Sequence, residues 1–148
     1  MTNCTVLLFL FMLLSNIVSS QNISGEVLSA INKGNSSVLD QNISEETLNT
    51  CFDLKESSYN YLAISIKMNK MESLKYFVEK GADLEHVCTG KTPLMYAVKY
   101  GQMEMVKYLI EKGAKISTET SKGKTALDYA RKYKQKEIEE FLEDQSDK

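Results

Sequence analysis

The residues best suited to chemistry in this sequence are two cysteines and the single histidine. Cys51 stands alone, whereas His86 and Cys88 are two positions apart. These residue types could form a nucleophile with its base, a set of metal ligands or a disulfide. A structural zinc site usually has four ligands at recognisable spacing, and a nucleophilic cysteine needs a rigid scaffold beside an oxyanion hole. The pattern provides neither, so we predict no metal, no cofactor, no catalytic residue and no enzymatic activity.

Two Gly-Lys-Thr triplets, beginning at Gly90 and Gly123, are similar to the end of a phosphate-binding loop. That loop needs another glycine five positions earlier, where this sequence has Glu85 and Thr118. No apolar strand precedes either triplet, so we expect neither a nucleotide nor another small-molecule substrate. The formal net charge of −2 gives no bulk attraction to nucleic acid, which we also exclude as a partner.

The first twenty residues differ in composition from the rest of the chain. An uninterrupted apolar run extends from Val6 to Leu14, and no charged side chain precedes Glu26. Such a run is shorter than the roughly 20 apolar residues that span a bilayer, so we predict a signal peptide over residues 1–20, cleaved between Ser20 and Gln21. The protein is then periplasmic or secreted, without stable membrane insertion. Because the first five residues include no Lys or Arg, an uncleaved anchor and a cytosolic chain stay open as alternatives.

Cleavage would change the cysteine count from odd to even. It would remove Cys4 and leave Cys51 and Cys88, and an even count in an oxidising compartment favours a disulfide. Two separate buried thiols are the alternative. Three glycosylation sequons, which matter only if the source glycosylates secreted proteins, would also remain at Asn22, Asn35 and Asn42.

An internal repeat defines the elements that must position these residues. Residues 60–84 align without gaps on residues 92–116 at an offset of 32, with ten identities, and the segment that starts at Gly90 returns at Gly123. A fixed period in this range is typical of stacked supersecondary units, none of which can bury its apolar face alone.

Each unit is predicted to contain two helices. Thr92 suits an N-cap and Pro93 the first position of a short helix that runs to Gly101. A second helix should end at Gly113, a suitable left-handed cap. The residues that we expect to face inward are Leu94, Ala97 and Val98 in the first helix and Val106, Leu109 and Ile110 in the second.

Residues 90–114 resemble the ankyrin repeat, whose Gly-x-Thr-Pro-Leu-His-x-Ala, mid-unit Gly, Val-x-x-Leu-Leu and Gly-Ala pattern they match closely. Met95 departs from it at the His position, and Tyr61 replaces the Pro of the preceding unit. The resemblance implies an all-α solenoid of about four stacked helix-turn-helix units with short hairpin loops. The predicted domain covers residues 21–148, with a degenerate unit at about 24–57 and further units at 58–89, 90–122 and 123–148.

The last unit is predicted to be a C-terminal cap. Glu139 and Glu143 fall at the positions of Val106 and Ile110, on a face that internal units bury. A terminal unit needs a polar outer face, because nothing stacks on it.

Stacking would also bring the two cysteines together. Cys88 lies in the loop before the Gly90 hairpin, and Cys51 lies in the connector one unit earlier. Neighbouring units of an ankyrin array place such loops side by side, so a Cys51–Cys88 disulfide is the prediction and two separate thiols are the alternative.

The resemblance further implies a concave face, made of first helices and hairpin loops, that binds another protein. In ankyrin repeats the variable contacts lie at the hairpin tip and in the two residues before the mid-unit glycine. We predict that the partner has an acidic surface, although exposed lysines can also be ordinary solvated surface. The positions carried over are Lys67, Met68, Lys99, Tyr100, Lys132 and Tyr133 before the glycine position, and Thr89, Lys91, Ser121, Lys122 and Lys124 at the tips.

The sequence therefore favours a monomeric, non-enzymatic module that binds one protein outside the cytoplasm. Two alternatives remain. One is a disulfide- or thiol-dependent envelope stress protein in which Cys51, His86 and Cys88 are the active part. The other is a secreted effector directed at a host.

Overall fold

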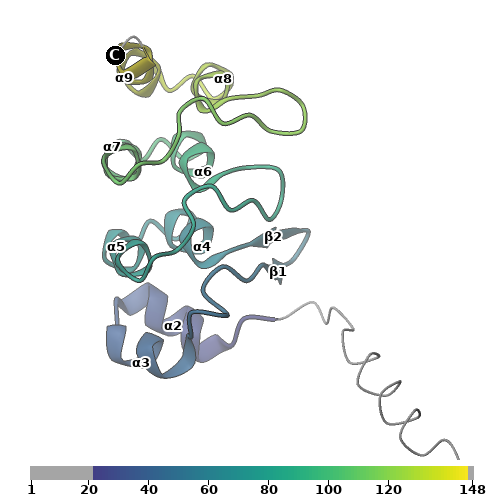
Figure 1. Ribbon diagram of the computed structural model, residues 1–148, viewed down its shortest axis with the longest axis vertical. Coiled ribbons are helices and arrows are strands. Elements are labelled where there is room, and N and C mark those ends of the chain that lie inside the picture. Colours follow the sequence, from purple (N-terminus) through teal and green to yellow (C-terminus); the bar gives the residue numbers. More distant parts are fainter. Residues whose placement is uncertain (1–21, 147–148) are drawn as a thin grey trace, which may run out of the picture.

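The computed structural model describes residues 22–146, so the predicted signal peptide lies outside the described part of the chain (Figure 1). Residues 22–146 form eight helices and one two-stranded sheet. The elements are α2 (Gly25–Lys33), α3 (Ser36–Asn42), β1 (Phe52–Leu54), β2 (Ser57–Tyr59), α4 (Tyr61–Lys67), α5 (Met71–Glu79), α6 (Pro93–Lys99), α7 (Met103–Glu111), α8 (Ala126–Lys132) and α9 (Lys136–Ser146). Among these helices, none is both long and apolar enough to cross a membrane.

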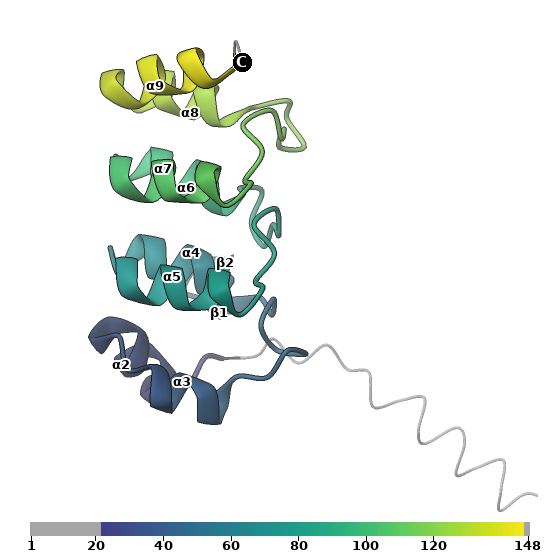
Figure 2. The same ribbon diagram turned by 60° about the vertical axis from the view of Figure 1, so that its left-hand side comes forward.

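The helices pair in chain order, and the pairs stack into an elongated molecule (Figures 1 and 2). Helices α4, α6 and α8 form one column, in which α6 packs against both of the others. Helices α5, α7 and α9 form the second column. The β1–β2 hairpin and the long loops project away from the helices on the side of α4, α6 and α8 (Figure 1). The predicted solenoid is therefore confirmed.

Side-chain caps begin the first helix of three successive pairs. The side chains of Asn60, Thr92 and Thr125 each accept a hydrogen bond from the backbone N–H three residues later, at 2.8, 3.3 and 3.3 Å. Pro93 occupies the first turn of α6, where its missing N–H leaves no partner unsatisfied. Gly113, with a φ of 100°, follows the end of α7. The predicted start of one helix and end of the next are confirmed.

The first helix pair has a left-handed glycine between its two helices and is hydrogen-bonded to the second pair. Gly34 takes a φ of 66° between α2 and α3, as Gly101 does between α6 and α7 with 68°. The hydroxyl of Ser73 in α5 donates to the backbone carbonyl of Ile31 at 2.7 Å, which joins the first pair to the second. The side chains that this pair buries include Val27, Ala30, Ile31 and Leu39.

Charged side chains of the C-terminal helix pair bond to one another. Arg131 in α8 donates to Glu139 at 3.0 Å and to Glu143 at 2.7 Å, both in α9. These hydrogen bonds keep the pKa of the Arg131 guanidinium above its usual value. Glu139 and Glu143, which stand at the positions of Val106 and Ile110, are thus paired with Arg131 at the end of the stack.

The sheet corrects the all-α prediction. Strands β1 and β2 are antiparallel, with Phe52 opposite Tyr59. Both of these aromatic side chains are buried, and Lys55 makes the turn with a φ of 61°. Phe52 packs on the ring of Tyr61, with 4.7 Å between the ring centroids. The segment forms a hairpin because both of its end aromatics pack on helix residues: Phe52 on Tyr61 of α4, and Tyr59 on Tyr96 of α6, with 5.5 Å between the ring centroids of the second pair. The repeat pattern does not contain these contacts.

Candidate functional site

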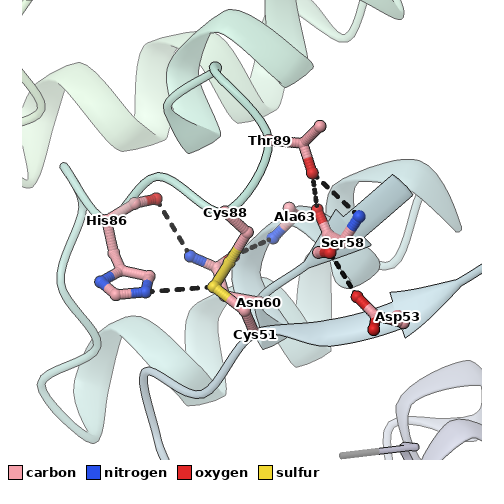
Figure 3. The surroundings of a disulfide bond; sticks show 8 residues. All are labelled: Cys51, Asp53, Ser58, Asn60, Ala63, His86, Cys88 and Thr89. Atoms are coloured by element: carbon pink, nitrogen blue, oxygen red, sulfur yellow. Dashed lines mark hydrogen bonds between the residues drawn. A yellow bond between two sulfur atoms is a disulfide. The ribbon is translucent and has the colours of Figure 1, made fainter. Parts of the chain in front are cut away.

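The three residues that carry thiol or imidazole chemistry meet at one point of the structure (Figure 3). Cys51 precedes β1, and His86 and Cys88 lie in the loop between α5 and α6. The sulfur atoms of Cys51 and Cys88 are joined at 2.03 Å, with their Cα atoms 5.6 Å apart. Nε2 of His86 lies 3.4 Å from the Cys51 sulfur. All three residues are partly exposed, so solvent reaches this cluster.

Hydrogen bonds hold the two loops of this cluster together independently of the disulfide (Figure 3). The Thr89 hydroxyl accepts from the Ser58 N–H at 2.9 Å and donates to the Ser58 carbonyl at 2.6 Å. The Asn60 side-chain amide donates to the backbone carbonyl of His86 at 3.2 Å. The β2 strand and the start of α4 are therefore fixed to the loop that carries His86 and Cys88.

A second group of residues forms a surface that we call the lysine-tyrosine face. It lies on the first helices and the loops before them, and it alternates ammonium groups with aromatic rings. Cation–π contacts of this kind contribute about 0.5–1 kcal/mol each at exposed sites. The residues of the face are Lys67, Lys91, Lys99, Lys132, Tyr59, Tyr96, Tyr100, Tyr129 and Tyr133.

Two lysines of this face connect successive helix pairs. Nζ of Lys91 lies 5.5 Å from the ring centroid of Tyr96 and 5.8 Å from that of Tyr129. Lys99 repeats the arrangement, with 5.2 Å to Tyr100 and 5.9 Å to Tyr133. The face therefore continues across the junction between the third and fourth helix pairs.

The charges on the lysine-tyrosine face influence one another. Burial lowers the pKa of Lys91, and the neighbouring charges of Lys99 and Lys132 lower it further. Burial acts to raise the pKa of Tyr59, but hydrogen bonds and the positive charges of Lys67 and Lys99 outweigh burial and lower it. The lowered pKa of Tyr59 shows that the positive charge on the face favours the anionic form of a group placed against it.

The face ends at a hollow near the C-terminal pair. This hollow has a volume of about 420 Å³. All three of its lysines are predicted partner contacts. Asp128 contributes a carboxylate, and hydrogen bonds from Thr125 lower the pKa of this group. The lining residues are Thr120, Lys122, Lys124, Asp128, Tyr129 and Lys132.

Comparison with known families agrees with this architecture. The family model described as ankyrin repeats (3 copies) matches residues 27–120 and, in a second match, residues 61–148. The chain belongs to the ankyrin-repeat family. No curated protein matches it. Ankyrin repeats generally bind other proteins and are non-enzymatic, which gives the chain the general character of a protein-interaction module.

The predicted contact residues of this ankyrin-repeat protein do not all have the same surroundings. Tyr100 is 36% exposed, and Ser121 and Lys122 are exposed on a turn whose backbone N–H groups at Lys122 and Lys124 donate to the Thr120 hydroxyl. By contrast, Met68 is half-buried against the core, and the Thr89 hydroxyl is occupied by Ser58. Of the predicted positions, the lysines and tyrosines therefore offer the most to a partner.

Sequence reasoning missed three tyrosines of the face. Tyr59 comes from β2, a strand that the all-α prediction did not include, and Tyr96 is almost fully buried beneath Lys91. Tyr129 stands in α8 at the position that Tyr96 has in α6, 33 residues earlier. That recurrence was a signal in the sequence that could have identified Tyr96 and Tyr129.

Proposed function

We propose that this ankyrin-repeat protein binds one partner protein as a monomer, without enzymatic activity and outside the cytoplasm. The contact between Lys99 and tyrosines of two successive helix pairs carries the proposal. This contact joins the residues that precede the turn between the two helices of each pair into one continuous surface. Aromatic and cationic side chains of this kind are frequent energetic anchors in protein interfaces.

The partner is proposed to present an acidic surface. Burial is the main cause of the lowered pKa of Lys91, and repulsion from the charges of Lys99 and Lys132 lowers it further. A partner carboxylate would relieve this repulsion, and complementary charge would also speed association. The exposed tip at Ser121 and Lys122 extends the positive surface toward the same partner.

The test combines Lys99→Glu with Tyr100→Ala. Affinity capture from the protein's own cell-envelope extract should retain a defined partner on the wild-type chain and lose it on the double variant. With that partner purified, we expect its Kd to rise at least about 10-fold, which corresponds to about 1.4 kcal/mol. Helical circular dichroism should stay unchanged.

Lys75→Glu is the matched control. Lys75 is an exposed lysine of α5, in the other helix column, and its reversal changes the net charge of the chain as Lys99→Glu does. Its Kd should stay near the wild-type value. Unaltered binding by the Lys99/Tyr100 double variant would refute the proposed face.

Export rests on the apolar run of residues 1–20 and has its own test. The protein recovered from outside the cytoplasm should begin at Gln21 when its N-terminal sequence is determined. Recovery from the periplasm favours a role in the envelope, whereas recovery from the culture medium favours the secreted, host-directed effector. A chain that retains Met1 in the cytosol would exclude both.

A thiol-dependent envelope stress protein is the second candidate. The contact of 3.4 Å between His86 Nε2 and the Cys51 sulfur favours it, since an imidazole beside a disulfide sulfur can assist its exchange reactions. Cys51→Ser combined with Cys88→Ser should then abolish protection of cells against envelope stress while partner capture continues. Protection that survives both substitutions excludes this candidate.

A further inference from the structure

We propose that Cys51, His86 and Cys88 form a zinc-binding site when their disulfide is reduced. The disulfide and the metal site would then be two alternative states of the same cluster, selected by the redox conditions. The inference does not depend on the lysine-tyrosine face, because none of its three ligands belongs to that surface.

The geometry of the cluster is close to what zinc needs. The three potential ligand atoms lie within 4.8 Å of one another. Tetrahedral zinc with Zn–S of about 2.3 Å and Zn–N of about 2.0–2.1 Å places sulfur and nitrogen roughly 3.5 Å apart. The distance from His86 Nε2 to the Cys51 sulfur is 3.4 Å. The two sulfurs must separate, from 2.03 Å in the disulfide to about 3.8 Å around a zinc ion.

The hydrogen bonds around the cluster should keep the ligands together after reduction. Thr89 holds Ser58 through two hydrogen bonds, and Asn60 holds the His86 carbonyl (Figure 3). None of these bonds involves a sulfur atom, so breaking the disulfide leaves them intact. Asn60 also caps α4 through its side-chain oxygen, which accepts from the Ala63 N–H at 2.8 Å. The site is therefore preorganised by residues that do not bind the metal themselves.

The change of state needs a dithiol reductant. Reduction breaks the Cys51–Cys88 bond and forms two thiols, while the two sulfurs of the reductant join in a disulfide of their own; two electrons and two protons pass to the protein. When Zn²⁺ binds, each thiol releases its proton to solvent, and His86 donates the Nε2 lone pair. A water molecule completes the four ligands.

The open fourth position distinguishes this site from a structural zinc site, which has four protein ligands. The cluster is also accessible, since Cys51, His86 and Cys88 are partly exposed and Val87 is 46% exposed. Both the reductant and the metal can therefore reach it without unfolding of the repeat.

The experiment uses Co²⁺ and Zn²⁺ with the full chain carrying Cys4→Ser, so that Cys51 and Cys88 are the only thiols. After reduction with dithiothreitol and its removal under argon, we expect one Co²⁺ per chain, with a thiolate-to-cobalt charge-transfer band that Zn²⁺ abolishes. The oxidised chain should show no such band. Competition with a chromophoric chelator gives the zinc affinity.

Two further variants test the assignment of the ligands. His86→Gln leaves the disulfide and its surroundings in place, and it should weaken zinc binding by at least about 10-fold. Val87→Ala, between the two loop ligands, should bind as the parent does. The proposal is overturned if the reduced chain gives no charge-transfer band, if His86→Gln binds zinc as tightly as the parent, or if a reduced chain that has lost its helical signal does not regain it with zinc.

Discussion

At the scale of single residues, burial raises the pKa of Tyr96 more than the charges of neighbouring residues do. The side chain is almost completely buried, and this desolvation raises its pKa to about 12 from an ordinary value of 10.0. The folded protein therefore favours the neutral phenol, whereas the unfolded chain ionises near pH 10. The stability that this preference contributes is fully present below pH 10 and is lost as the pH rises toward 12.

We accordingly predict that Tyr96→Phe reduces the alkaline loss of stability. Melting temperatures measured between pH 9 and about 12 should fall less steeply for the variant than for the wild type, because one ionisable phenol is gone. Part of the fall should persist, since burial and a hydrogen bond to Asp40 also raise the pKa of Tyr76 to about 12.

Tyr100→Phe is the control for this measurement, because its ring belongs to the same face but is 36% exposed. The comparison concerns slopes rather than absolute melting temperatures, which loss of a buried hydroxyl can change at any pH. Equal slopes in the wild type and in Tyr96→Phe would show that the buried phenol does not contribute to the pH dependence.

At the scale of the elements, the turn between α6 and α7 depends on Gly101. Its φ of 68° lies in the left-handed region, and a Cβ built there would lie 2.8 Å from the side-chain amide of Gln135 in the next unit. We predict that Gly101→Ala lowers the free energy of unfolding by about 1–2 kcal/mol, the cost of a left-handed non-glycine residue. Urea denaturation followed by circular dichroism measures it.

Gly25→Ala makes the same chemical change in a different setting. Gly25 begins α2, and a Cβ there would meet no atom within 4 Å. The unfolding free energy should stay the same or rise by up to about 1 kcal/mol, because alanine restricts the unfolded chain. An equal loss in both variants would argue against a specific conformational requirement at Gly101.

These elements also show what the sequence could predict. The start of α6 at Thr92 and Pro93 was predictable, and so was the end of α7 before Gly113, because caps depend on residues within one turn of the helix end. The repeat period then identified which helices stack. Local signals and a regular spacing were sufficient for most of the architecture.

The β1–β2 hairpin and the full lysine-tyrosine face depended on longer-range information. Phe52 and Tyr59 pair across the hairpin, and their rings contact Tyr61 of the second helix pair and Tyr96 of the third, contacts that spacing along the chain does not give. The position of Lys91 between Tyr96 and Tyr129 depends on how two stacked units are placed relative to each other. Spacing along the chain identified Lys91 but could not give the rings that it contacts.

At the scale of the whole molecule, each unit contacts only its neighbours, so the connections between units determine how cooperatively it unfolds. The Gln102 side chain donates to the Ile66 carbonyl at 2.7 Å, and Glu85 accepts from the Lys115 N–H at 2.9 Å. The Cys51–Cys88 disulfide is the covalent connection among the described residues, and it encloses the β1–β2 hairpin and the α4–α5 pair.

Removing this disulfide should destabilise the array substantially. A cross-link with a sequence separation of 37 residues lowers the entropy of the unfolded chain enough to stabilise the folded state by about 3–4 kcal/mol. We predict a loss of this size in Cys51→Ser combined with Cys88→Ser, measured by urea denaturation with a chelator present so that no metal replaces the cross-link. Cys4→Ser should unfold as the wild type does. Because the closed loop contains the second helix pair, amide exchange should accelerate more in α4 and α5 than in α8 and α9; uniform acceleration along the stack would mean that the units unfold together rather than pair by pair.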